Sequence, residues 1–207
     1  MTKRWSLYLP LMLAMALFSC AEESIEPEPV TPASGLKGEY DFVSVSIDAI
    51  TTSESSQAGL IMRSVSKVIY TSKNNRGTYS FDGKNVIGTD VAYSIDTTLN
   101  TLFYTGDPEP LEMDMPFVVD LPPYSSTGTY RVIGTDSLFF EGGFVSGPVS
   151  TGSPSMASPP SGGKFYFSGD LLVLTSRVDH TSTVTEMGLT VTNSTHGNTT
   201  VRLRKKK

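Results

Sequence analysis

Residues that bind metals or activate nucleophiles are scarce in this chain. Its 207 residues include one cysteine, two histidines and one tryptophan. A single cysteine excludes an intrachain disulfide, and two histidines provide few bases for catalysis near neutral pH. The formal net charge of −5 argues against nucleic acid, which proteins bind through clusters of lysine and arginine. We therefore expect a protein that is not an enzyme and that has no cofactor, no metal and no nucleic-acid partner.

The amino-terminal residues have the layout of an export signal. Lys3 and Arg4 precede an apolar run over 5–18 that only Ser6 and Pro10 interrupt. A run of about 14 residues is too short to cross a bilayer, for which a helix needs about 20. The pattern predicts a signal peptide over 1–19 that is removed during export.

The signal ends in Leu17-Phe18-Ser19-Cys20, which resembles the lipobox of bacterial lipoproteins. In that family an aliphatic residue lies three positions before the cysteine and a small residue lies directly before it. The resemblance implies cleavage between Ser19 and Cys20, a diacylglycerol on the Cys20 thiol and usually a fatty acid such as palmitate on the new amino terminus. The alternative is an ordinary secretory signal that ends near a cysteine.

Residues 20–35 read as an acidic, proline-rich tether. They contain four glutamates and three prolines and almost no side chain to bury, so we expect an extended, solvated segment. In polyproline geometry 15 residues reach roughly 45 Å. Ala21 is not the aspartate that retains lipoproteins at the inner membrane, and Glu22 and Glu23 resemble surface-display signals of some Gram-negative lipoproteins. We expect a lipid anchor in the outer membrane, at its periplasmic face or at the cell surface; a linker that is simply acidic is the alternative reading of the two glutamates.

Alternation of apolar and polar residues dominates the rest of the chain, 36–207. It is clearest over 112–121, where Met113, Met115, Phe117, Val119 and Leu121 share one face. This period of two predicts a strand with one buried face. Pro116 cannot donate to a ladder, so we expect this strand at an edge or at a bulge.

Other parts of 36–207 repeat this pattern at hairpin spacing. Turns are expected at 82–85 and 97–100. The region 58–73 fits a strand or a short helix, and its ending Val68-Ile69-Tyr70-Thr71 favours a strand. The Gly-, Pro- and Ser-rich segment 147–163 predicts a long loop, either functional or disordered, and its composition favours disorder. The remaining predicted strands cover 40–47, 78–81, 87–95, 101–104, 129–133, 138–145, 165–167, 171–175, 184–192 and 199–203.

These runs predict a single all-β domain, an antiparallel up-and-down barrel or a sandwich of about eight to ten strands. Its opening, Gly38-Glu39-Tyr40, resembles the start of the lipocalin-like domains common among bacterial lipoproteins, which have glycine, any residue and then tryptophan. The resemblance implies an up-and-down barrel with a cavity. Packing accounts for the many aromatics of the domain, and some would line a pocket for an apolar or sugar-like ligand if one end of the barrel is open.

Few residues are candidates for chemistry. We expect His180 in a polar turn and His196 at a hairpin tip, both exposed and not catalytic, and no glycine-flanked serine elbow accompanies them. Asp107, Glu109, Glu112 and Asp114 form an acidic group that lacks the ordered spacing of a calcium loop.

The carboxyl terminus holds a basic cluster. We expect Arg202 and Arg204 on the solvent-exposed face of the last strand. Lysines 205–207 are expected to form a frayed end that discourages pairing with another sheet edge. Contact with membrane phosphates is the alternative.

The sequence therefore predicts a lipid-anchored, non-enzymatic binding or accessory module, for which a small apolar or sugar-like ligand is one expectation. A structural or adhesive surface protein without a small ligand is the alternative. An esterase-like enzyme would require one of the two histidines to meet a serine and a carboxylate.

Overall fold

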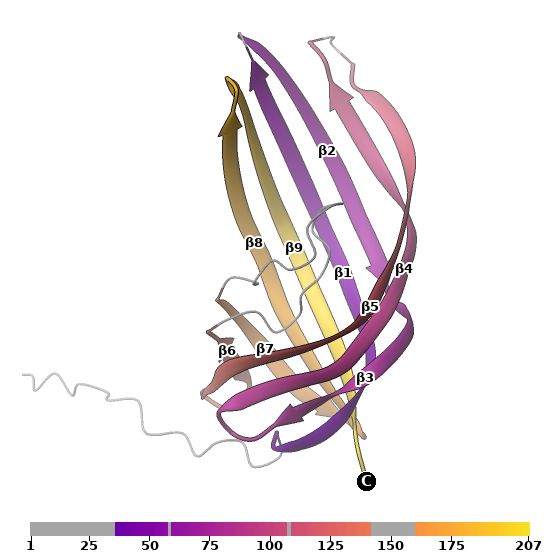
Figure 1. Cartoon of the computed structure of the whole chain (residues 1–207), viewed down its shortest axis with the longest axis vertical. Helices are drawn as coiled ribbons and strands as arrows, with labels where there is room; N and C mark the ends of the chain where they lie inside the picture. The colour runs from indigo at the N-terminus through magenta and orange to yellow at the C-terminus, as the bar shows by residue number, and fades with distance from the viewer. Residues whose placement is uncertain (1–35, 58, 107–108, 142–159) are drawn as a thin grey trace, which may run out of the picture.

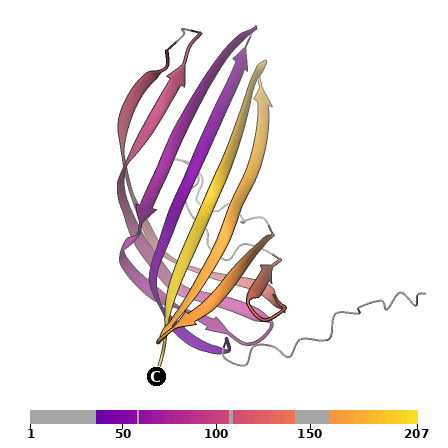
Figure 2. The same cartoon turned by 180° about the vertical axis from the view of Figure 1, so that it is seen from behind.

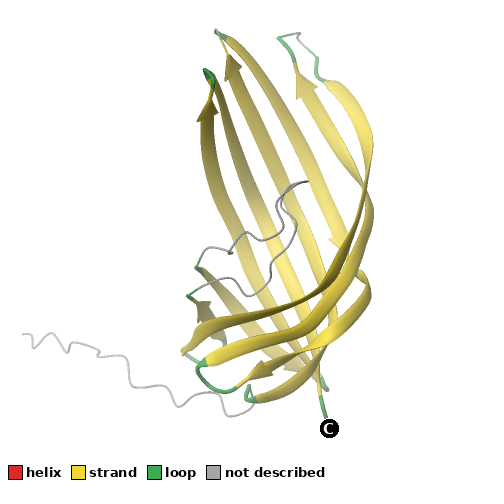
Figure 3. Ribbon diagram, viewed as in Figure 1, coloured by secondary structure: helices red, strands yellow, loops and turns green. Residues whose placement is uncertain are grey.

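The described part of the chain is built from β-strands. The computed structural model describes residues 36–57, 59–106, 109–141 and 160–207 and contains no helix there (Figure 3). The strands form one antiparallel sheet, which confirms the predicted all-β, antiparallel class. They are β1 (Gly38–Gln57), β2 (Leu60–Thr71), β3 (Lys73–Phe81), β4 (Asn85–Tyr104), β5 (Leu111–Ile133), β6 (Ser137–Phe140), β7 (Ser161–Ser168), β8 (Leu171–Glu186) and β9 (Leu189–Lys205).

The sheet closes into a barrel because its last strand, β9, pairs with β1. β2 and β3 lie on the same side of β1 and act as one long strand that bends at Ser72. At the bend, the Ser72 amide donates to the Val45 carbonyl (2.8 Å) and the Val45 amide donates to Ser72 Oγ (2.8 Å). With β2 and β3 counted together, the chain forms an eight-stranded up-and-down barrel, one of the two architectures that the sequence predicts.

The barrel has a closed half and an open half (Figure 1, Figure 2). Near the start of β1 and the end of β9, β6 and β7 complete the ring between β5 and β8. β6 has four residues and β7 has eight, and both stay in this closed half. The longer strands continue past them as a curved sheet with the order β5, β4, β2, β1, β9, β8, which we call the open half. It comprises residues 111–121, 93–104, 60–71, 46–57, 189–198 and 177–186.

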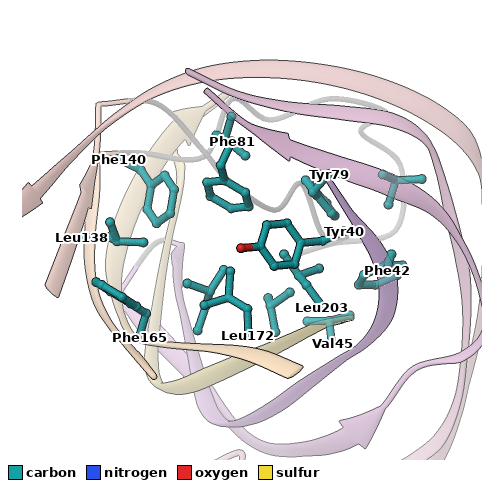
Figure 4. Close-up of a cluster of buried hydrophobic side chains, with 14 of the residues drawn as sticks. Tyr40, Phe42, Val45, Tyr79, Phe81, Leu138, Phe140, Phe165, Leu172 and Leu203 are labelled. Atoms are coloured by element: carbon teal, nitrogen blue, oxygen red, sulfur yellow. The ribbon is translucent and has the colours of Figure 1, made fainter. Parts of the chain in front are cut away.

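Aromatic and aliphatic side chains fill the closed half (Figure 4). Tyr40 lies near its centre, and its hydroxyl donates to the Leu36 carbonyl (3.0 Å). The Phe81 ring makes edge-to-face contacts with Tyr40 (5.7 Å between centroids) and with Tyr130 (5.4 Å). The aromatics of this half therefore form a hydrophobic core, as expected from packing.

Bulges change which residues of a strand face this core. In β1 the register shifts between Phe42 and Ser44, so that Phe42 and Val45 are both buried. In β4 the register shifts between Gly88 and Val91. The strict alternation predicted for 87–95 is therefore wrong at its start, where Val86 is 3% exposed and Ile87 is 39% exposed.

The alternation predicted for 112–121 is confirmed. Met115, Phe117, Val119 and Leu121 are half-buried, while the residues between them are exposed. Met113 shares the face that was expected to be buried, but its side chain is 45% exposed. Over 111–121 this strand pairs with β4 alone among the described residues, so the expected edge position is confirmed as well.

Some predicted connections differ from those in the structure. The turn at 82–85 is confirmed: the Asp82 carboxylate accepts bonds from the Asn85 and Lys84 amides (2.6 and 2.7 Å), which lower its pKa to about 2. The expected turn at 97–100 is wrong, because β4 runs through it. The predicted strand 184–192 is two strands, joined by Met187 and Gly188, both with positive φ (49° and 78°). The strand reading of 58–73 is confirmed by β2, and most of 147–163 lies outside the described residues.

A matched pair of leucines tests the position of the core. Leu172 is 0% exposed and Leu111 is 61% exposed. Leu172→Ala should lower the free energy of unfolding by about 2 to 5 kcal/mol, because it leaves a cavity. Leu111→Ala should change it by less than about 0.5 kcal/mol. Urea denaturation measures both, and equal effects would contradict the packing described.

The buried tyrosines predict unfolding at alkaline pH. Burial raises the pKa of Tyr70 to about 12 and, with a smaller effect from Tyr124, raises the pKa of Tyr79 well above its usual value. Because these groups ionise near 10 in the unfolded chain, their stabilisation is complete below about pH 10 and is lost as the pH rises through the folded-state values. Circular dichroism and tyrosinate absorbance should therefore change together. Full tyrosine ionisation near pH 10 with an intact fold would be the contrary result.

Candidate functional site

The inward face of the open half carries two rows of polar side chains that run across the strands. Cross-strand pairing places the members of each row side by side. One row is Ser64, Ser53, Asn193 and Ser182, and the other is Thr101, Ser66, Thr51, Thr195 and His180. We call these nine side chains the polar band.

The two rows of the polar band differ in their hydrogen bonding. In the row nearer the core, Ser66 Oγ lies 2.8 Å from Thr101 Oγ1, and Thr51 Oγ1 lies 3.1 Å from Thr195 Oγ1. Thr101 is 1% exposed, and the other eight members of the band are half-buried. In the outer row, no side chain bonds to another described residue. The outer row therefore offers hydroxyl groups and one amide to a ligand.

Apolar residues border the polar band on both sides. Toward the core lies a row of Val68, Ala49, Gly197 and Val178. Here β1 and β9 approach so closely that a Cβ on Gly197 would lie 2.5 Å from the Ala49 Cβ. Toward the other end lie Met62, Val191 and Val184, beside a hollow of about 200 Å³ lined by Ser55, Leu60, Ile61, Met62, Thr105 and Leu189.

The dimensions of the polar band follow from sheet geometry. It crosses five strands, which at about 4.8 Å per strand gives a width of about 19 Å, and its rows are about 7 Å apart. Its groups donate and accept hydrogen bonds, and its borders offer apolar contact. This chemistry suits binding of an extended polar ligand, since ligand sites combine apolar surface with a few placed polar groups.

The two histidines lie on opposite faces of the sheet. His180 is on β8 and belongs to the polar band, whereas His196 is on β9 and its Nδ1 lies 2.9 Å from Asp179 Oδ1 on the outer face. Both side chains of that pair are more than half exposed. The expected positions in a turn and at a hairpin tip are wrong, because both histidines are within strands and the connection lies at 187–188. The two histidines cannot serve one site.

The acidic residues do not gather into a metal site within the described ranges. Glu112 and Asp114 project outward from β5 and accept bonds from Asn100 Nδ2 (2.6 and 3.2 Å). Asp107 lies outside the described residues.

The predicted last strand is confirmed, but the frayed end expected at lysines 205–207 is wrong, because Lys205 belongs to β9 and the Lys206 amide donates to the Glu39 carbonyl (2.9 Å). Arg204 pairs with Asp170 (3.1 Å), and Lys206 lies 3.8 Å from Glu39 and 3.7 Å from Asp41. Arg202 donates to Ser46 Oγ (3.3 Å).

A second, open hollow of about 460 Å³ lies where β7 and β8 diverge, and Lys164 and Arg177 line it.

The predicted anchor residues, Ser19 and Cys20, lie outside the described part of the chain, as do the signal peptide and the tether. In the described part no helix is long and apolar enough to cross a membrane.

Comparison with protein-family models, curated proteins and solved structures gives no significant match.

The sequence reasoning missed the polar band. Its only signal is composition, because 51–55 and 193–195 consist of threonine, serine, asparagine and one glutamate. Such residues also occur on solvated faces, and without an alternating apolar residue nothing in the sequence shows which of these side chains point inward.

Proposed function

We propose that this protein is a lipid-anchored, non-enzymatic binding protein of the outer membrane, at its periplasmic face or at the cell surface, and that its ligand is a carbohydrate bound along the polar band. The outer row of the polar band carries the proposal: its inward polar side chains have no bonding partner among the described residues, and apolar residues border them. The likeness of Leu17–Cys20 to a lipobox supports the anchor.

A carbohydrate matches the chemistry of this face. Sugar rings carry hydroxyl groups at their edges and apolar C–H groups on their faces, so one ring can bond to Asn193 or Ser53 while it contacts Val191 or Met62. The band is about 19 Å wide, and an oligosaccharide would use more of it than a single sugar. The filled closed half leaves the open half as the place for such a ligand.

A structural or adhesive surface protein without a small ligand is the second candidate. The filled interior of the closed half favours it, because a barrel that serves only as a scaffold has no need of a cavity. A scaffold role does not explain why the polar side chains of the outer row have no hydrogen-bonding partner among the described residues.

Two asparagines of β9 provide a matched test of the ligand. Asn193 faces inward in the band, and Asn198 faces outward. If a screen of soluble oligosaccharides identifies a bound glycan, Asn193→Ala should weaken its binding about tenfold, because the loss of a hydrogen-bonding side chain costs about 1 to 1.5 kcal/mol. Asn198→Ala should leave the affinity unchanged. Calorimetric titration measures both, and equal affinities, or the absence of any glycan ligand, would refute the carbohydrate proposal.

The anchor is tested separately. Cys20→Ser should prevent acylation and leave the signal peptide uncleaved, because the thiol is the only one in the chain. Mass spectrometry of the wild-type protein should find a diacylglycerol on residue 20 as the new amino terminus. A mature wild-type protein with a free thiol would contradict the anchor and leave the carbohydrate proposal open.

A further inference from the structure

Among the described residues, no strand pairs with one long edge of β8 in the open half. β7 pairs with β8 only as far as Ser176. Beyond it, residues 177–186 pair with β9 alone among the described residues. A row of unpaired backbone donors and acceptors is a template for another strand.

The turn at the end of β8 determines which backbone groups point to this edge. Met187 and Gly188 form a two-residue hairpin loop with positive φ at both positions, so Glu186 and Leu189, which flank it, form a hydrogen-bonded pair. Pairs alternate along an antiparallel ladder, so the even-numbered residues of β8 bond to β9. The odd-numbered residues, 177 to 185, direct their N–H and C=O groups to the open edge.

The opposite edge of the open half, on β5, is protected. Pro116 has no N–H to donate, Pro122 and Pro123 directly follow this segment, and Glu112, Asp114 and Asp120 place carboxylates along the strand. Prolines and charges are the usual means of blocking a sheet edge. The edge of β8 has no proline; Arg177, Asp179 and Glu186 lie toward its two ends, and threonine, serine, valine and His180 make up the rest. The two edges therefore differ in proline, and the β8 edge is the one that keeps every N–H donor for strand addition.

We propose that this edge pairs with the same edge of a second copy of the protein, antiparallel about a two-fold axis at Thr181. In this register Thr181 lies opposite Thr181 of the second copy. Residue 179 then lies opposite 183, and residue 177 lies opposite 185. All five outward-directed residues are paired, which gives about ten hydrogen bonds between the copies.

The side-chain pairs formed in this register are better matched than those of a register shifted by one residue. On the inward face it places Val178 opposite Val184 and His180 opposite Ser182, so that apolar residues meet apolar residues and the polar bands of the two copies join. No like charges lie opposite each other. A shift of the axis to Ser182 would place Val178 against Glu186 and leave residue 177 unpaired. Cross-strand pairs of matched character stabilise a sheet, and mismatched pairs do not.

The pairing has a consequence for the anchors, and this step rests on the anchor of the proposed function. The start of β1 and the carboxyl terminus lie at the closed end of each barrel (Figure 1). Antiparallel pairing of β8 therefore places the two closed ends at opposite ends of the dimer. A dimer with an anchored copy at each end can join two facing membranes.

Cysteine crosslinking tests the register. The full chain carrying Cys20→Ser and purified in detergent has no other thiol, so an introduced cysteine reports its own position. Thr181→Cys should form a disulfide-linked dimer under mild oxidation, because the self-opposed residues have Cα atoms about 5.5 Å apart, within the range that a disulfide spans. Thr185→Cys is the control: its two copies would be about 26 Å apart along the strands. A monomeric Thr181→Cys protein, or equal crosslinking of both variants, would overturn the proposal.

A proline variant tests the backbone pairing without the crosslink. Thr183→Pro removes an N–H that points away from β9, so the fold should persist while dimerisation is lost; Thr183→Val keeps the N–H and should still dimerise. Analytical ultracentrifugation measures the association, and circular dichroism verifies the fold. Vesicles that carry the acylated wild-type protein should then aggregate, and those that carry acylated Thr183→Pro should not. Since the crosslinking experiment needs no lipid, failure of the anchor alone would leave its result intact.

Discussion

The pairing of β9 with β1 is the constraint on which the architecture depends. It joins the two ends of the chain's strand order over most of the length of β1, from Tyr40 to Ser56. Because the ring closes here, the aromatic side chains of β1, β3, β4 and β5 face one another across a common interior. Without this pairing the closed half would be a curled sheet with Tyr40 and Leu203 at its borders, in contact with water.

The short strands β6 and β7 explain why one molecule has two different halves. They complete the ring only near the start of β1 and the end of β9, so among the described residues the ring of strands is closed there and open beyond. The change in side-chain chemistry follows the same boundary. Tyrosine, phenylalanine and leucine face inward in the closed half, and serine, threonine and asparagine face inward at the polar band. A continuous backbone framework thus supports an apolar core at one end and a row of half-buried polar side chains at the other.

The sequence predicted the class of fold, the meander order and several local features. The alternation from Met115 to Leu121 and the turn at Asp82 follow from local chemistry, and both were found as predicted. The bulges were not predictable, because the extra residue at Val43 depends on pairing with the distant strand β9, and the positive φ of Asp90 (50°) lies where β4 must pair with β3 and β5 at once. The polar band could not be predicted either, because it depends on the register of distant strands. Asn193 and Ser53 are 140 positions apart, and only the β1–β9 register places them side by side.

The division into a filled half and an open half also implies a gradient of local stability along the barrel. Buried core residues such as Tyr40, Phe81 and Leu172 are concentrated at one end of the barrel. The hairpin tips at the other end carry the exposed side chains of Leu60, Ile61 and Met187. Segments with few buried apolar contacts open more readily than the global fold does. We therefore expect the distal hairpins to exchange their amide protons through local fraying and the core to exchange through complete unfolding. A molecule bound across the distal strands would slow only the first process, and it would do so without moving a single core side chain.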